Sequence, residues 1–106
     1  METTLITKLF TSFEEIKHLR EDGSEYWSAR DLQLLLAYKD WRNFEIVMEK
    51  AMTACREAGN SKFDHFVGVN KMISAGKTAE REIFDIHLTR YAAYLIAQNG
   101  DSRKQE

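Results

Sequence analysis

Apolar residues fall at helical and then at alternating intervals in the first 30 positions. Four of them lie on one face of a short amphipathic helix predicted over residues 5–15: Leu5, Leu9, Phe10 and Phe13. An Asp22-Gly23 pair follows between two strand-compatible runs. Because glycine tolerates a positive φ, this pair favours a tight turn. We therefore expect a hairpin of two strands near residues 16–20 and 25–28.

Two helices are predicted in the middle of the chain. Ser28, followed three residues later by Asp31, is a capping-box pattern that begins the first of them. Asp40 is placed to cap the second and longer helix. The apolar stripe of this second helix repeats every three or four residues: Trp41, Phe44, Met48, Ala51 and Cys55. We expect it to end at Gly59, because glycine is preferred just past a helix end.

Two further strands and a last helix are predicted in the second half. Residues 65–73 are compatible with a strand, residues 74–78 with a loop, and residues 82–87 alternate between two faces. Thr89 is placed to cap a helix that ends at Asn99-Gly100. The order of elements indicates an α+β fold. We expect one small domain in which a short antiparallel sheet of two hairpins packs against several helices.

The length of 106 residues corresponds to one domain, so residues 1–106 are predicted to fold as a single unit. Residues 101–106 are polar, and we expect a frayed tail or a point where a longer protein was cut. The longest apolar run, residues 34–38, is far shorter than the roughly 20 residues of a membrane span. No secretory signal is visible. The single cysteine fits a reducing compartment, which predicts a cytoplasmic location.

The charge balance argues against a strong nucleic-acid binder. The chain has 15 basic and 17 acidic residues and a net charge of −2, whereas such binders are usually basic. The charge is nevertheless uneven along the chain. Residues 1–40 hold 5 basic and 8 acidic groups, and residues 41–105 hold 10 basic and 8 acidic groups. A modest basic surface is therefore predicted in the second half.

Patterns of catalytic or metal-binding residues are weak. Gly76-Lys77-Thr78 resembles the end of a phosphate-binding loop, but Lys71 stands where that motif needs its first glycine, so a polar turn is favoured. Cys55 and the three histidines lack the spacing of metal ligands: His18, His65 and His87. We predict no catalytic residue, no metal and no cofactor, and we do not expect an enzyme. A spatial pair of Cys55 with a histidine stays open.

Basic residues interleaved with aromatic ones give the candidate binding sites. One group accompanies Trp41 where the two central helices meet: Arg30, Lys39 and Arg42. A second group surrounds the glycine-containing loop, with only Glu80 as a nearby acid: Lys71, Lys77 and Arg81. Aromatic rings stack on bases and cations contact phosphates. The six cations are therefore candidates for nucleic-acid or partner binding, with a solvated rim around an aromatic core as the alternative.

Several sequence blocks are long and specific enough to indicate a family. They are Phe13-Glu-Glu-Ile-Lys-His18, Glu25-Tyr-Trp-Ser-Ala-Arg-Asp-Leu32, Trp41-Arg-Asn-Phe44, Ala51 to Cys55, Asp64-His-Phe66 and Leu88-Thr-Arg-Tyr-Ala-Ala-Tyr-Leu-Ile-Ala-Gln-Asn-Gly-Asp101. Over roughly residues 8–104 the chain resembles the N-terminal part of the DNA damage-inducible protein D (DinD-like) family. It is also distantly similar to the BRO-N domain of phage antirepressors and viral BRO proteins.

The resemblance implies an α+β domain, a bacterial or phage setting and a link to the DNA-damage (SOS) response, with no catalytic residues. Members of the family usually continue into a second region that this chain lacks. The function we expect is a non-enzymatic domain that binds DNA or a recombinase filament on DNA. The alternative is a protein–protein module without nucleic-acid contact, which forms a homodimer through the N-terminal helix: Leu5, Leu9 and Phe10.

Overall fold

The computed structural model describes residues 11–74, 76 and 79–100. Residues 11–15 are helical. The labelled elements then follow in the order β1 (His18–Leu19), β2 (Glu25–Ser28), α2 (Ala29–Leu35), α3 (Trp41–Glu57), α4 (Lys62–His65), β3 (Phe66–Ser74), β4 (Glu80–Leu88) and α5 (Arg90–Gln98). Among the predicted features, Leu5, Leu9, Phe10, Lys77 and the tail 101–106 lie outside the described residues.

The four strands form one antiparallel sheet in the order β1-β2-β4-β3. The first hairpin joins β1 to β2 through a turn in which Gly23 has φ +88°. The second hairpin joins β3 to β4 in nine consecutive pairs, from Phe66 opposite Leu88 to Ser74 opposite Glu80. The predicted α+β fold with two hairpins packed against helices is confirmed. β3 begins and ends one residue later than predicted, and β4 extends beyond the predicted residues 82–87 at both ends, because the ladder continues to the loop.

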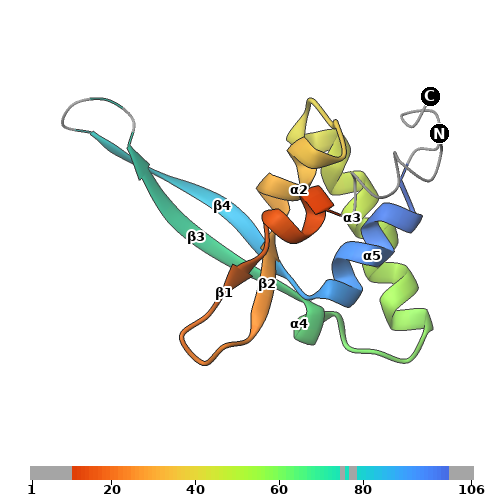
Figure 1. Cartoon of the computed structure of the whole chain (residues 1–106). Coiled ribbons are helices and arrows are strands. Elements are labelled where there is room, and N and C mark those ends of the chain that lie inside the picture. The colour runs from red at the N-terminus through yellow and green to blue at the C-terminus, as the bar shows by residue number, and fades with distance from the viewer. Residues whose placement is uncertain (1–10, 75, 77–78, 101–106) are drawn as a thin grey trace.

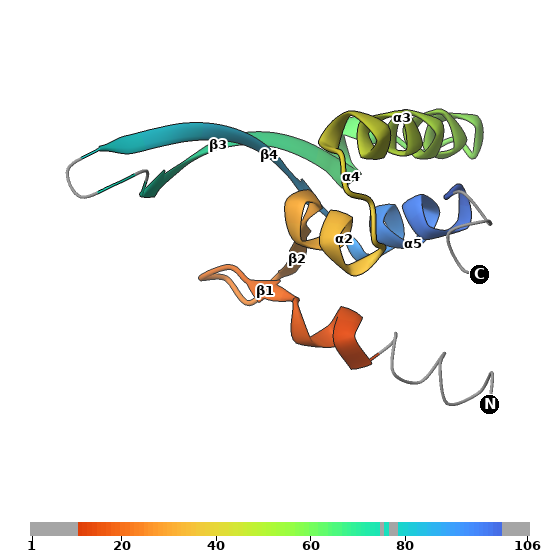
Figure 2. The same cartoon turned by 90° about the horizontal axis from the view of Figure 1, so that it is seen from above.

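The second hairpin projects from the helical part of the molecule. Figures 1 and 2 show α3, α4 and α5 gathered near one end of β3 and β4, while the other end of these strands extends away from every helix. We call the projecting part, residues 69–74 and 80–85, the arm. Beyond its base the two strands of the arm have no described helix packed over them, and most of its side chains remain exposed or half-buried.

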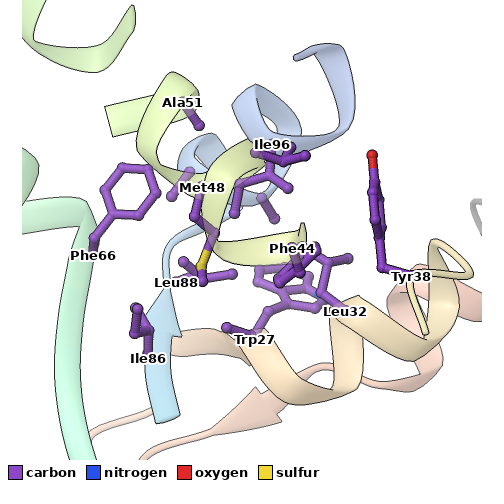
Figure 3. Packing of buried hydrophobic residues seen from close by; sticks show 14 of the residues in the cluster. Trp27, Leu32, Tyr38, Phe44, Met48, Ala51, Phe66, Ile86, Leu88 and Ile96 are labelled. Carbon is purple, nitrogen blue, oxygen red and sulfur yellow. The ribbon is translucent and has the colours of Figure 1, made fainter. Parts of the chain in front are cut away.

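The hydrophobic core lies at the base of the arm, between the sheet and helices α3 and α5 (Figure 3). Trp27 of β2 is fully buried there, stacks on Phe13 at 4.4 Å between ring centroids, and donates its indole N–H to the Phe13 carbonyl at 2.8 Å. The predicted stripe of α3 supplies Phe44, Met48, Ala51 and Cys55 to the same cluster. The interpretation of Cys55 as a core residue is therefore confirmed.

The predicted helix starts are also confirmed, with one difference in detail. The Ser28 and Thr89 hydroxyls accept from backbone N–H groups of α2 and α5. Asp40 is the N-cap residue of α3, but its carboxylate accepts from the Asn43 side chain and makes no capping bond to the backbone. The short helix α4, capped by Ser61, was not predicted, because a single turn has no apolar period. No helix among the described residues is long and apolar enough to cross a bilayer.

Candidate nucleic-acid interface

The first basic group lies where α2 meets α3, on the side of β4 that faces away from β3. The Arg30 guanidinium stacks over the Trp41 ring at 3.8 Å from the ring centroid. Its Nε donates to the Phe84 carbonyl oxygen at 3.0 Å, which ties the start of α2 to the arm. Lys39 and Arg42 flank this contact along the chain and are exposed. The structure therefore brings Arg30 and Trp41 together, as the aromatic and basic interleaving indicated.

None of these three cations is neutralised by an acidic residue in the described part of the chain. The ion pairs found there involve Lys17, His18, Lys71 and Arg90. Arg30 is held by a carbonyl oxygen and an aromatic ring, both of which leave its positive charge intact. The junction of α2 and α3 is therefore a place where a phosphate would meet uncompensated positive charge.

Strand alternation separates the side chains of the second hairpin onto two faces. The lysine face holds Val67, Val69, Lys71, Ile73, Arg81, Ile83, Asp85 and His87. The phenylalanine face holds Phe66, Gly68, Asn70, Met72, Ser74, Glu80, Glu82, Phe84, Ile86 and Leu88. The exposed acids of the arm thus lie on one face and its basic residues on the other. This separation gives the arm a basic surface that its sequence composition conceals.

The two described cations of the arm differ in their surroundings. Arg81 is exposed and makes no ion pair with a described residue. Lys71 lies opposite Ile83, well back from the loop, and its ammonium contacts the Asp85 carboxylate at 3.0 Å. Lys71 is close to the loop in the sequence, but in the structure it lies nearer to the base of the arm, beside Asp85. Glu82 also lies on the arm, so Glu80 is not the only nearby acid.

Asp85 is a buried acid with four polar partners. Its side chain is 1% exposed. It accepts from the Ser28 hydroxyl at 2.5 Å, the Ile86 N–H at 2.8 Å, the Lys71 ammonium at 3.0 Å and the Arg30 N–H at 3.1 Å. These donors come from β2, β4, β3 and the start of α2. One carboxylate therefore joins the base of the arm to the helix that carries Arg30.

The same contacts predict an acid-sensitive step in stability. Burial by itself would raise the pKa of Asp85, but the donors from Ser28, Ile86, Lys71 and Arg30 outweigh it and lower the pKa below its ordinary 3.8. The native carboxylate thus binds a proton less readily than the unfolded one. Its stabilisation is present above about pH 4 and is lost as pH falls through the native pKa.

A titration of the Asp85 carboxyl carbon by NMR, run beside thermal melts over the same pH range, tests this prediction. The expected result is a midpoint below 3.8 and a melting temperature that falls over the same interval. A midpoint above the ordinary value would mean that burial dominates and that the donors do not hold the carboxylate.

A stacked row of rings crosses the sheet at the base of the lysine face. The rings of Tyr26 and His87 lie 4.0 Å apart, and those of His18 and Tyr26 lie 5.1 Å apart. The Arg20 guanidinium lies over Tyr26 at 4.5 Å, and His18 contacts Asp31 at 3.0 Å. Burial and the positive charge of Arg20 lower the pKa of His87. Reasoning from the sequence missed this row, although the Asp22-Gly23 turn sets His18 opposite Tyr26.

Arg90, which was not among the six candidate cations, is paired with two carboxylates. Its guanidinium donates to Glu25 at 2.9 and 3.0 Å and to Glu14 at 2.8 and 3.2 Å. Hydrogen bonds from Arg90 are the largest cause that lowers the pKa of both carboxyls. The guanidinium also lies 4.9 Å from the centroid of the Trp27 ring. Arg90 therefore links the N-terminal helical segment, β2 and α5, with its charge neutralised.

The described residues provide little for catalysis or metal binding. Cys55 is buried, its thiol contacts the Asn60 carbonyl, and burial raises its pKa. His65 contacts the Thr89 hydroxyl at 2.7 Å and the edge of the Tyr91 ring. Within residues 11–74, 76 and 79–100, no group of three or more His, Cys, Asp or Glu side chains is placed to hold a metal ion.

Comparison with known proteins gives this arrangement a family. The profile of the BRO family, N-terminal domain, matches residues 15–106. The chain belongs to this family. The BRO-family domain is also 46% identical over 92 residues to the DNA damage-inducible protein D of Escherichia coli strain K12, a match that covers 87% of this chain. Both parts of the predicted resemblance are therefore confirmed.

The match spans about a third of the length of that relative, 34%. No solved structure was found to match the chain. The matched residues include β3, β4 and the junction of α2 and α3, so the arm and the first basic group both lie inside the family domain.

Proposed function

We propose that this BRO-family domain binds DNA through the junction of α2 and α3 and the lysine face of the arm. The observation that carries the proposal is the set of cations at the junction without acidic partners in the described structure: the half-buried Arg30 and the exposed Lys39 and Arg42. Phosphate contacts supply most of the sequence-independent affinity of DNA-binding proteins. A local excess of cations is sufficient for such contacts even in a chain with a net charge of −2.

The shape of the arm supports the same function. A two-stranded antiparallel ribbon fits the major groove of B-DNA, and β3 and β4 project beyond the helices as such a ribbon (Figure 1). The lysine face would point Arg81 and Lys71 at the duplex, and in the sequence Lys77 stands in the connection between the strands. Lys71 would contact a phosphate while it keeps its bond to Asp85. In this arrangement the exposed acids of the phenylalanine face point away from DNA.

We propose further that the domain acts in the DNA-damage response by binding and not by catalysis, in the cytoplasm of a bacterium. The support is the name of its relative, DNA damage-inducible protein D. A recombinase filament assembled on DNA is the second form of target that we propose. The DNA of the filament would contact the same cations. The recombinase surface would make additional contacts with the phenylalanine face.

The test is fluorescence anisotropy of labelled single- and double-stranded DNA with this chain at about 50 and 200 mM salt. We expect micromolar binding that weakens about tenfold or more over this range, because each phosphate contact releases a counterion. Reversing the charge of Lys77 and Arg81 should weaken binding with the fold intact. Unchanged affinity would remove the arm from the proposal, and the absence of binding at 50 mM salt would overturn it.

A protein–protein role without nucleic acid is the second candidate, and exposed apolar side chains favour it. On and beside the phenylalanine face, Phe63 is 75% exposed, Met72 56% and Phe84 45%. The apolar residues first suggested for this role, Leu5, Leu9 and Phe10, lie outside the described residues. Salt separates the two candidates, since a mostly apolar interface keeps its affinity when salt rises. A titration with recombinase filaments in place of naked DNA is then the next measurement.

A further inference from the structure

The free edge of the arm is an unusual feature of this sheet. Strand β3 is the last strand in the order β1-β2-β4-β3, so one of its two edges has no neighbouring strand in the described structure. Exposed strand edges attract other strands, and proteins normally protect them with charged side chains, prolines, bulges or short lengths. β3 has none of these protections. It is nine residues long, its ladder has no bulge, the chain contains no proline, and its one charged residue, Lys71, is held by Asp85.

Two hydrogen bonds identify which backbone groups of β3 point to the open edge. In an antiparallel ladder the N–H and C=O of one residue point to the same side, and the side alternates along the strand. The Phe84 carbonyl accepts from Arg30, on the side of β4 that faces away from β3. The Thr89 N–H donates to the His65 carbonyl, on the side that faces β3. Odd-numbered residues of β3 therefore bond to β4, and the even-numbered ones point outward: Phe66, Gly68, Asn70, Met72 and Ser74.

We propose that a second copy of this chain pairs with this edge, β3 against β3, antiparallel and centred on Asn70. Asn70 is the midpoint of Phe66–Ser74, so only this register pairs all nine residues of both strands. In it the outward-facing groups of each copy meet the outward-facing groups of the other. The two hairpins then form one continuous four-stranded sheet with a two-fold axis at Asn70, which is the self-complementary contact typical of symmetric dimers.

The side chains fit this register as well as the backbone. Met72 of each copy comes to lie opposite Gly68 of the other. A groove of about 240 Å³ is present there, lined in part by Met52, Phe63, Gly68 and Phe84. The Phe84 ring already covers the space above Gly68, because a Cβ on that glycine would lie 3.0 Å from it. In this register the exposed Met72 side chain leaves water and packs against the Phe84 ring that covers Gly68.

The charges are compatible with the same pairing. Lys71 comes opposite Val69 of the second copy, so no two like charges stand directly across the new strand pair, where they would repel. The groove is also lined by Lys62, which has no ion pair with a described residue. Glu82 neighbours Met72 on the phenylalanine face and approaches this lysine when Met72 enters the groove. The occupant of the edge that complements both shape and charge is therefore the chain itself.

Sedimentation velocity of the chain from about 1 to 200 µM tests the proposal. The expected result is a shift from the 12.4 kDa monomer to a species of twice that mass. Asn70→Pro removes one outward N–H and keeps every bond of the hairpin ladder, so it should weaken the dimer at least tenfold while the circular dichroism spectrum stays unchanged. Met72→Lys should weaken it similarly. The control is Leu34→Lys, which removes an even more exposed apolar residue from α2 and should leave the dimer intact.

Disulfide trapping tests the register without relying on the proline variant. Single cysteines at positions 69, 70 and 71 are oxidised separately, with Cys55 buried and unreactive in each. Asn70→Cys should give the highest yield of covalent dimer, because only residue 70 stands opposite itself in the proposed register. A monomer at every concentration would overturn the proposal. A dimer insensitive to Asn70→Pro, or trapped equally at all three positions, would place the interface elsewhere. None of these measurements involves DNA, so their outcome is independent of the proposed function.

Discussion

Replacement of Asp85 by alanine is expected to lower the free energy of unfolding by about 3–5 kcal/mol, the cost of breaking a buried charge pair from one side. The change leaves the Ser28 hydroxyl and the N–H groups of Arg30 and Ile86 without their acceptor, and Lys71 without its counter-charge. Each unsatisfied buried donor costs about 1–3 kcal/mol unless water reaches it. The loss falls on the joint between α2 and the arm, and urea denaturation measures it.

A neighbouring acid on the same strand provides the control. Glu82→Ala removes a carboxylate that is exposed and has no ion pair in the described structure, so its effect should stay within about 0.5 kcal/mol. Asp85→Asn keeps an acceptor oxygen but loses the charge, and should fall between the two. If Asp85→Ala and Glu82→Ala cost the same, the four contacts of Asp85 contribute nothing to stability.

Reversal of two junction charges, Lys39→Glu with Arg42→Glu, is expected to weaken DNA binding about a hundredfold at 50 mM salt. Each lost phosphate contact lowers the slope of log K against log salt concentration by about 0.9. At low salt, the loss of two such contacts therefore lowers the affinity about a hundredfold. Both side chains are exposed and neither holds the fold, unlike Arg30, which bonds to the Phe84 carbonyl. Anisotropy at several salt concentrations measures both the affinity and the slope.

A second double reversal on α3 has the same change in net charge. Lys50 and Arg56 are exposed on this helix, about 12 and 21 Å along its axis from Arg42. Lys50→Glu with Arg56→Glu should change affinity only a few-fold, through long-range repulsion. Equal losses for the two double variants would show that net charge alone controls binding, and the junction would then have no special role.

The two predictions concern one structural unit. Asp85 accepts from the Arg30 N–H, and the Arg30 side chain extends from there to Phe84 and Trp41. The carboxylate therefore fixes the base on which the junction cations are displayed. It also engages Lys71, which reduces the charge that this residue offers to a phosphate. Arg81 and the junction cations consequently carry more of the proposed DNA contact than Lys71 does.

Much of the local structure followed from the sequence. The Asp22-Gly23 turn, the caps at Ser28 and Thr89 and the stripe of α3 were all predicted, because each depends on residues within a few positions of one another. The helix α4 was missed, since its single turn depends on a Ser61 cap and on its place between α3 and β3. The proximity of Arg30 to Trp41 was also predictable, as only 11 positions separate them.

The sequence by itself determined the order of elements, the α+β class, the family and the six candidate cations. Hydrophobic periodicity, helix caps and family-specific sequence blocks each depend only on residues that are close together in the chain. Only the tertiary structure decided which charges are free. Lys71 is engaged by Asp85 14 residues away, and Arg90 by Glu14 and Glu25, which lie 76 and 65 residues away. The projection of the arm and the open edge of β3 also depend on strand order. Such properties follow from contacts between distant segments, which form only when the whole sheet assembles around its core.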